Sequence, residues 1–209
     1  MEKEWSKIVF ATGNAGKMKE IRMILADMGM EILSMKEAGI ATDAEENGAT
    51  YEENALIKAR AIAALLPGKD AIVLADDSGL EVDYLNCEPG IYSARYLGED
   101  TPYSIKNANL IERLNGVEDS KRTARFVCAI AAVLPDGTEL AVRDCVEGRI
   151  GYEEKGSNGF GYDPIFYVPE FDKTTAELTE EEKNQISHRG KALRLMKEEL
   201  KKHEGTDCQ

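Results

Sequence analysis

The segment IVFATGNAGKMKEI, residues 8–21, joins a short apolar run to a glycine-containing turn, a lysine and an amphipathic continuation. Residues 8–11 are predicted to form a strand, and residues from 17 to about 28 a helix with an apolar stripe. A helix N-terminus that follows such a turn directs its backbone N–H groups at an anion. The stretch predicts an α/β protein with a phosphate-binding turn near its start. A purely structural turn with a surface lysine fits these residues equally well.

The same segment is not a P-loop, whose pattern is G-x-x-x-x-G-K-[ST]. If Gly16 and Lys17 form the G-K pair, a glycine should stand where Ala11 does. A serine or threonine that holds magnesium should stand where Met18 does. A metal, if the protein uses one, is therefore expected to be held by other residues.

Periodicity, capping residues and turn residues predict the remaining elements. The predicted strands are one at 31–34, one from 71 that ends at Asp76 and Asp77, and a hairpin over 122–150 with its turn at 135–137. One predicted helix begins at the Thr50 and Glu53 capping box and stops at Pro67 and Gly68. A second runs from the cap Thr101 and Pro102 to about Asn115, and a third from 187 to about 202. Strands alternate with helices before a hairpin follows, which favours an α/β fold with a mixed sheet. Residues 1–209 are interpreted as one domain, for which two lobes are natural but their boundary is not readable.

Asp76 and Asp77 follow an apolar run in the sequence LADDSG. Ligands of α/β sheets gather at the carboxyl ends of strands. Because side chains alternate along a strand, the two carboxylates need not point the same way. One is a candidate Mg²⁺ ligand, and the other would orient a neighbour or activate water. A solvated Asp-Asp-Ser-Gly turn is the structural alternative.

Three further acids, Glu45, Glu46 and Glu53, are candidates to complete a magnesium shell, although acids are abundant in this chain. Lys58 is a candidate phosphate contact, but a surface position is the simpler expectation for it.

The sequence NGFGYDP places Gly159 and Gly161 on either side of Phe160. Glycines permit close approach of a backbone, and an aromatic ring can stack on a base. Asp163 is a candidate acceptor for a base or sugar. A glycine-rich loop that buries its aromatic residues is the alternative.

The sequence EEKNQISHRGKAL brings Lys183, His188 and Arg189 to a predicted loop–helix junction. His188 and Arg189 are candidate donors to a base carbonyl or a phosphate. A pair of this kind is more often structural, so the residues alone are weak evidence of a site.

Composition narrows the class of protein. The formal net charge of −13 disfavours binding to nucleic acid, which is itself a polyanion. No apolar run approaches the length of a membrane span, and the N-terminus lacks the features of a signal peptide. Four scattered cysteines form no C-x-x-C pair, which fits a reduced protein without a zinc site. A cytoplasmic protein is expected.

Taken in order, TGNAGK, ENALIKA, ADDSGL, PGIYSARY, FGYDPIF, AEL with EEKN, and SHRGKAL resemble one family. They are similar to the motifs of the inosine triphosphatase (Ham1/RdgB) family, over the chain from residue 8 to about 200. The resemblance implies Mg²⁺-dependent hydrolysis of ITP, dITP and XTP to the monophosphate and pyrophosphate. It also implies an elongated two-lobed α/β fold with a mixed sheet, flanking helices and a central substrate cleft, and usually a homodimer.

The resemblance also implies roles for individual residues. Asp77 would be the proton acceptor and a metal ligand, with Glu45 as a second ligand, although Glu46, Glu53 and Asp76 stay open as alternatives. The triphosphate, base and sugar would be bound by Thr12, Gly13, Asn14, Ala15, Gly16, Lys17, Ser78, Phe160, Gly161, Tyr162, Asp163, Lys183, His188 and Arg189.

Two rival functions remain open at this stage. One is an enzyme acting on modified pyrimidine triphosphates, and the other is a module that binds nucleotides without hydrolysing them. The presence of both the Asp76–Asp77 pair and Lys17 argues against the second, because a sensor need not keep both carboxylates. An ordinary aspartate is a weak base for water, so metal binding is weighted above proton abstraction for Asp77.

Overall fold

A computed structural model describes residues 5–42, 45–66 and 70–203. The strands are β1 Lys7–Phe10, β2 Glu31–Ser34, β3 Ala71–Val82, β4 Glu88–Pro89, β5 Thr123–Val133, β6 Glu139–Ile150, β7 Phe166–Val168 and β8 Lys173–Thr174. The α-helices are α1 Ala15–Leu25, α2 Tyr51–Ala63, α3 Tyr103–Arg113, α4 Glu180–Ile186 and α5 His188–His203.

The strands form one mixed sheet in the order β2-β1-β3-β5-β6-β7-β8, and β4 pairs with β3. Strand β1 is parallel to both β2 and β3. The pairs β3–β4, β6–β7 and β7–β8 are antiparallel. The mixed α/β sheet, the strand at Glu31–Ser34 and the β5–β6 hairpin are therefore confirmed.

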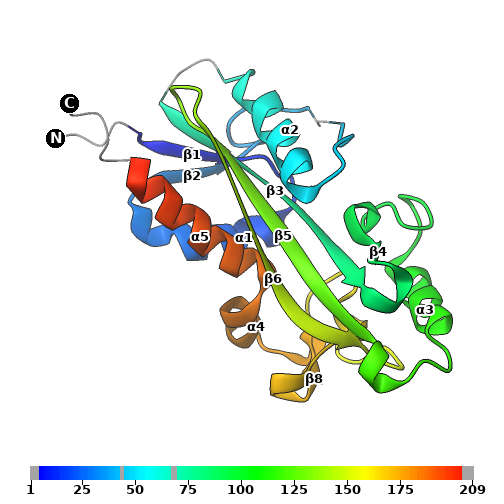
Figure 1. Ribbon diagram of the computed structural model, residues 1–209. Coiled ribbons are helices and arrows are strands. Elements are labelled where there is room, and N and C mark those ends of the chain that lie inside the picture. Colours follow the sequence, from blue (N-terminus) through cyan, green and yellow to red (C-terminus); the bar gives the residue numbers. More distant parts are fainter. Residues whose placement is uncertain (1–4, 43–44, 67–69, 204–209) are drawn as a thin grey trace. The chain divides into compact units, whose positions relative to one another are not determined.

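The chain divides into two compact units. Unit 1 comprises the described residues up to Asp77, residues 128–144 and those from Arg189 onward. In its core, apolar side chains of α1 and α5 pack on one face of β1, β3 and β5. Figure 1 shows α2 on the other side of these strands. Helix α2 buries Tyr51, Ala55, Ala59 and Ile62.

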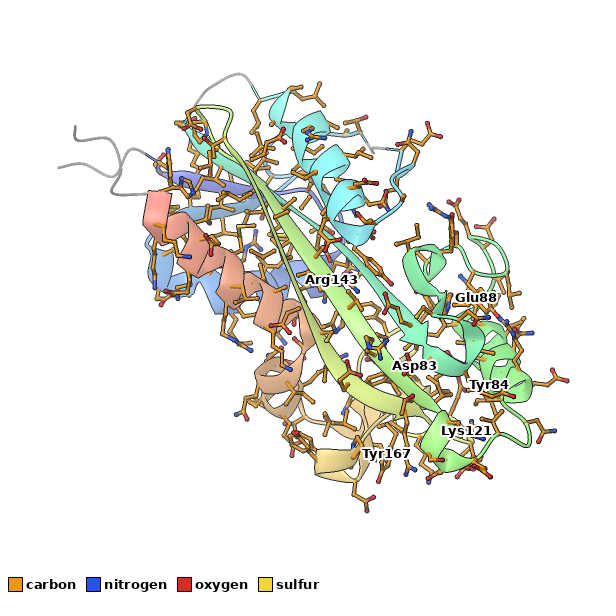
Figure 2. The ribbon with its side chains drawn as sticks, viewed as in Figure 1. Asp83, Tyr84, Glu88, Lys121, Arg143 and Tyr167 are labelled. Atoms are coloured by element: carbon orange, nitrogen blue, oxygen red, sulfur yellow. The ribbon has the colours of Figure 1, made fainter. Side chains whose placement is uncertain are left out.

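Unit 2 comprises Ser78–Val127 and Cys145–His188. Its core joins the second half of β3 to α3, β7 and parts of β5 and β6. A 3₁₀ turn, Asp83–Leu85, follows β3 directly; Asp83 and Tyr84 are labelled in Figure 2. Unit 2 also holds the glycine-rich loop before β7 and the short helix α4.

Two local expectations were wrong. Strand β3 does not end at the two acids but continues through Asp77 to Val82, because both carboxylates find partners within the fold. The cap of α3 is Pro102, not Thr101, whose hydroxyl donates to the Leu97 carbonyl instead.

Helix α4 was not expected, and Lys183 lies in it and not at a loop junction. The predicted stop at Pro67 and Gly68, and the tail after 203, lie outside the described residues.

Candidate active site

The first strand–helix turn is held by its own side chains. Asn14 caps α1, and its Oδ1 accepts the backbone N–H of Lys17 at 3.1 Å. The hydroxyl oxygen of Thr12 accepts the N–H of Asn14 at 3.2 Å. Helix α1 begins at Ala15, and its first residues are exposed. This leaves a helix N-terminus of the kind that binds anions at the carboxyl end of β1.

Asp76 is the centre of a buried ion-pair network in unit 1. Its carboxylate accepts from Lys17 Nζ at 2.9 Å and from Arg189 Nε at 3.2 Å. Arg189 also donates to Glu20, at 2.8 Å. Burial alone would raise the pKa of Asp76, but the charges of Lys17 and Arg189 outweigh it and hold the pKa well below its ordinary value. Asp76 is therefore a fixed counter-ion.

Asp77 faces a different set of groups in the same unit. Asn54 Nδ2 donates to Asp77 Oδ2 at 3.0 Å. Lys58 Nζ lies 3.9 Å from Asp77 Oδ1 and donates to Glu46 Oε1 at 2.9 Å. Burial raises the pKa of Asp77 to about 6; Lys58 opposes this shift and the charge of Glu46 adds to it. Asp77 is thus a carboxylate with a raised pKa that lies near Lys58 and Glu46.

The different partners of Asp76 and Asp77 confirm the expected alternation along the strand. They also correct the expectation for Lys58. Its side chain is only 12% exposed and lies at Asp77, not on the surface. Two acids adjacent in sequence therefore have separate partners, because the strand turns them to opposite faces.

In unit 2, the glycine-rich loop closes around Asp163. Its carboxylate accepts from the Phe160 N–H at 2.8 Å, Lys183 Nζ at 2.5 Å and the Thr175 hydroxyl at 2.8 Å. A Cβ on Gly159, which has a φ of +76°, would lie 2.2 Å from Asp163 Oδ2. Lys183 Nζ also lies 5.6 Å from the centroid of the Phe160 ring. The structure thus brings Phe160, Asp163 and Lys183 together.

The remaining predicted residues of the loop and its surroundings have distinct places. The Phe160 ring is 54% exposed, whereas Tyr162 is buried and donates its hydroxyl to the Ser93 carbonyl. His188 stacks on Phe126 with ring centroids 5.0 Å apart. Ser78 is half-buried within β3. Arg189, predicted to bind the substrate together with His188, contacts Asp76 and Glu20 in unit 1.

The metal ligands predicted from the resemblance are only partly assembled. Within the described part of the chain, no three His, Cys, Asp or Glu side chains converge into a ready metal site. Glu45 is exposed, whereas Glu46 lies close enough to Asp77 to raise its pKa. Asp76 is engaged by two cations. Of the acids left open by the sequence, Glu46 is therefore the one that the structure brings to Asp77.

Sequence reasoning missed three residues that organise these groups: Asn54, Thr175 and Glu20. Asn54 carried a usable signal, because it is a polar residue among the apolar positions of the helix in ENALIKA, and it is fully buried. Thr175 and Glu20 carried none, since a threonine in a loop and a glutamate on a helix are common.

Comparison with known proteins settles the family. The model of the Ham1 family matches residues 8–199 of this chain. The chain belongs to the Ham1 family. A relative in Clostridium perfringens, a dITP/XTP pyrophosphatase, is 52% identical over 198 residues, which cover 93% of this chain and 97% of that protein. The dITP/XTP pyrophosphatase of Escherichia coli O157:H7 is 49% identical over 197 residues, which cover 93% and 98%.

Solved Ham1 structures share the fold. The Ham1 protein of Staphylococcus aureus superposes with a TM-score of 0.84 at 43% identity, covering 95% of this chain and all of that one. A Ham1 protein from Coxiella burnetii gives a TM-score of 0.84 at 41% identity, covering 94% of this chain and 99% of that one. The α/β fold expected from the resemblance is confirmed.

Proposed function

We propose that this chain hydrolyses non-standard purine nucleoside triphosphates, namely ITP, dITP and XTP, to the monophosphate and pyrophosphate. Such an enzyme cleanses the nucleotide pool and keeps hypoxanthine and xanthine out of DNA and RNA. The names of its close relatives support the reaction. The observation that carries the proposal is the pair of faces on β3. On one face, Asp76 forms an ion pair with Lys17. On the other face, Asp77 lies near Lys58, which also pairs with Glu46.

The first strand–helix turn is the proposed triphosphate site. The exposed N-terminus of α1 supplies backbone N–H groups, and Lys17 supplies a positive charge. Asp76 holds that charge in place through a buried pair. Phosphate affinity at this turn therefore requires no P-loop serine or threonine. The residues proposed to take part are Thr12, Gly13, Asn14, Ala15, Gly16 and Lys17.

A magnesium ion is proposed to bind the acids on the Asp77 face of β3. Magnesium is commonly held by one or two carboxylates together with substrate phosphates and water. Asp77 and Glu46 supply two carboxylates on one side of β3, and Glu45 lies next to Glu46 in the chain. Bound magnesium would neutralise negative charge on the triphosphate, where phosphoryl transfer gains most.

Asp77 is the proposed acceptor of a proton from the attacking water. Without a bound cation, burial raises the pKa of Asp77 to about 6, with Lys58 opposing the shift and Glu46 adding to it, and a bound magnesium ion would lower that pKa. Most of the Asp77 carboxyl is still ionised at pH 7. Lys58 lies where its charge can stabilise negative charge that develops on the substrate.

Selection of the base is proposed to depend on the 6-position of the purine. Hypoxanthine and xanthine carry a carbonyl there, and adenine carries an amino group. A site that offers donors, among them His188 and those backbone N–H groups of the loop that are not already bonded within it, leaves those donors unpaired when ATP binds. Unpaired buried donors produce large discrimination. Ser78, Lys183 and Arg189 remain proposed substrate contacts.

A panel of triphosphates tests this function. Initial rates of pyrophosphate release from ITP, dITP, XTP, GTP and ATP would be compared with Mg²⁺ and with EDTA. We expect kcat/KM for ITP, dITP and XTP to exceed that for ATP by about 10²-fold or more, and EDTA to abolish turnover. Equal rates with ATP would refute the 6-carbonyl proposal, and preference for a modified pyrimidine triphosphate would favour the rival substrate class.

The proposed state is a cytoplasmic homodimer, supported by the family resemblance. No helix in the described part of the chain is long and apolar enough to cross a membrane. Light scattering coupled to gel filtration would give about twice the mass of the 23.1 kDa chain if the dimer is correct.

A further inference from the structure

Asn54 ties two acid-bearing segments together inside unit 1. It lies in the first turn of α2 and is fully buried. Its Nδ2 donates to Asp77 Oδ2 at 3.0 Å, and its Oδ1 accepts the backbone N–H of Gly48 at 2.8 Å. The N–H of Gly48 can only donate, so the amide oxygen must face it and the amide nitrogen must face Asp77. The orientation of this amide is therefore determined by its neighbours.

The loop before α2 packs closely on the same amide. A Cβ at Gly48 would lie 2.8 Å from Asn54 Oδ1 and 2.8 Å from Glu53 Cβ, so the loop approaches as only a glycine allows. Two residues earlier in this loop is Glu46, which accepts from Lys58. Asn54 and Lys58 are four residues apart and share one face of α2. Two side chains of α2, Asn54 and Lys58, therefore each contact both Asp77 and the loop that carries Glu46.

We propose that Asn54 is a positioning residue, which holds the Asp77 carboxylate and the Glu46 loop in a single arrangement suited to a divalent cation. This inference rests on the proposed function and deepens it. A hydrogen-bond partner behind a metal-binding carboxylate fixes the rotation of that carboxylate. Here the amide nitrogen of Asn54 donates to the Asp77 carboxylate, and its amide oxygen accepts the Gly48 N–H in the loop that carries Glu46.

The first test compares Asn54→Ala with Ile62→Val, a matched control. Ile62 is buried in the same helix two turns further on, and its shortening lowers stability without touching these polar groups. For Asn54→Ala we expect kcat to fall about 10²-fold and the Mg²⁺ concentration for half-maximal activity to rise about tenfold. KM for the nucleotide at saturating Mg²⁺ should stay within about twofold of wild type, since the phosphate turn is intact. The Ile62→Val protein should match wild type in all three values.

Amide hydrogen exchange supplies a readout that needs neither metal nor turnover. In Asn54→Ala the Gly48 amide loses its acceptor and should exchange about tenfold faster or more, whereas Ile62→Val should leave it protected. A second variant, Asn54→Asp, keeps an oxygen for Gly48 but replaces the donor to Asp77 with a carboxylate oxygen. We expect Gly48 to stay protected in Asn54→Asp while kcat still falls.

The possible outcomes distinguish a failure of the proposed hydrolysis from a failure of the role assigned to Asn54. If wild type releases no pyrophosphate from any triphosphate, the proposed function fails. If wild type is active and both Asn54 variants keep kcat and the Mg²⁺ requirement within about twofold of Ile62→Val, the positioning role is overturned. Unchanged exchange at Gly48 in Asn54→Ala would overturn the link to the loop. If Asn54→Ala does not fold, the isosteric Asn54→Asp decides the role toward Asp77.

Discussion

Two neighbouring residues, Asp76 and Asp77, show how one sequence doublet supplies two kinds of carboxylate. Asp76 is 2% exposed and bonded to two cations, so its pKa is lowered. Asp77 has nearly the same burial, but an amide and an acid face it together with one lysine, so its pKa is raised. The direction of each shift follows from the balance between burial and neighbouring charge. Asp76 therefore stabilises the fold, and Asp77 is available for chemistry.

Replacing Asp76 with asparagine should therefore destabilise the protein. The change removes one of the two carboxylates paired with buried Arg189 and also the buried partner of Lys17. We expect a loss of about 3–5 kcal/mol in the free energy of unfolding, measured by urea denaturation. Glu139→Gln, which breaks the exposed pair with Arg60, is the control and should cost less than about 1 kcal/mol. Equal effects of the two changes would contradict a structural role for Asp76.

Replacing Asp77 with asparagine should act on turnover and not on stability. Asparagine keeps the size of the side chain but removes the charge and the proton acceptor. We expect kcat for dITP to fall by about 10²-fold or more while the urea midpoint does not decrease. Steady-state kinetics and denaturation on the same preparation provide the check. Near-normal turnover in Asp77→Asn would refute the assignment.

Gly159 lies so close to Asp163 and Lys183 that a side chain at this position would clash with them. An added Cβ would meet both Asp163 Oδ2 and, at 2.6 Å, Lys183 Nζ. Gly116 is the matched control, because its φ of +75° is almost the same and nothing lies within 4 Å of its added Cβ. We expect Gly159→Ala to raise KM for dITP severalfold, whereas Gly116→Ala should cost only about 1–2 kcal/mol of stability. If both variants raise KM alike, the Asp163–Lys183 pair is not part of substrate binding.

At the scale of elements, charged side chains join neighbouring strands in unit 2. Arg125 of β5 pairs with Asp83, which follows β3, at 2.9 Å and with Glu147 of β6 at 2.9 Å. Asp83 also accepts the Thr123 hydroxyl at 2.6 Å. Burial would raise the pKa of Asp83, but these hydrogen bonds and the charge of Arg125 lower it overall. Figure 2 labels Asp83 near the end of β3.

This network predicts a pH-dependent contribution to stability. A carboxyl whose pKa is lower in the folded state contributes stability above its unfolded pKa of about 4 and loses it as pH falls through the folded value. Asp83 is partly exposed, so we expect Asp83→Asn to lower stability by less than about 1 kcal/mol at pH 7. The difference from wild type should shrink as the pH is lowered below about 4, measured by urea denaturation at a series of pH values. A difference that does not change with pH would contradict the role of the Asp83 charge.

Element by element, the sequence predicted what local chemistry decides. The β5–β6 hairpin followed from Pro135, Asp136 and Gly137, and the start of α2 followed from its Thr50 cap. The length of β3 did not follow, because Asp-Asp-Ser-Gly favours a turn when read alone. In the fold, Asp76 accepts a hydrogen bond from Lys17, 59 residues away in the sequence, and Asp77 accepts one from Asn54, 23 residues away. Contacts at such separations leave no local pattern.

At the scale of the whole molecule, the two units are not consecutive in the chain. Their boundaries fall within strands β3, β5 and β6 and directly after the first residue of α5. No linker composition marks such a boundary, which is why the sequence could not reveal it. The family followed from seven motifs in a fixed order, whereas the grouping of their residues required the structure. Arg189 illustrates this, since it follows His188 directly yet pairs with Asp76.

The products formed from dITP test the central claim most directly. Purified protein would be incubated with dITP and Mg²⁺, and the nucleotides and phosphates separated by ion-exchange chromatography. We predict dIMP and pyrophosphate in equal amounts, with no dIDP, and no reaction in EDTA. Formation of dIDP with inorganic phosphate, or tight binding of dITP without any product, would contradict the account.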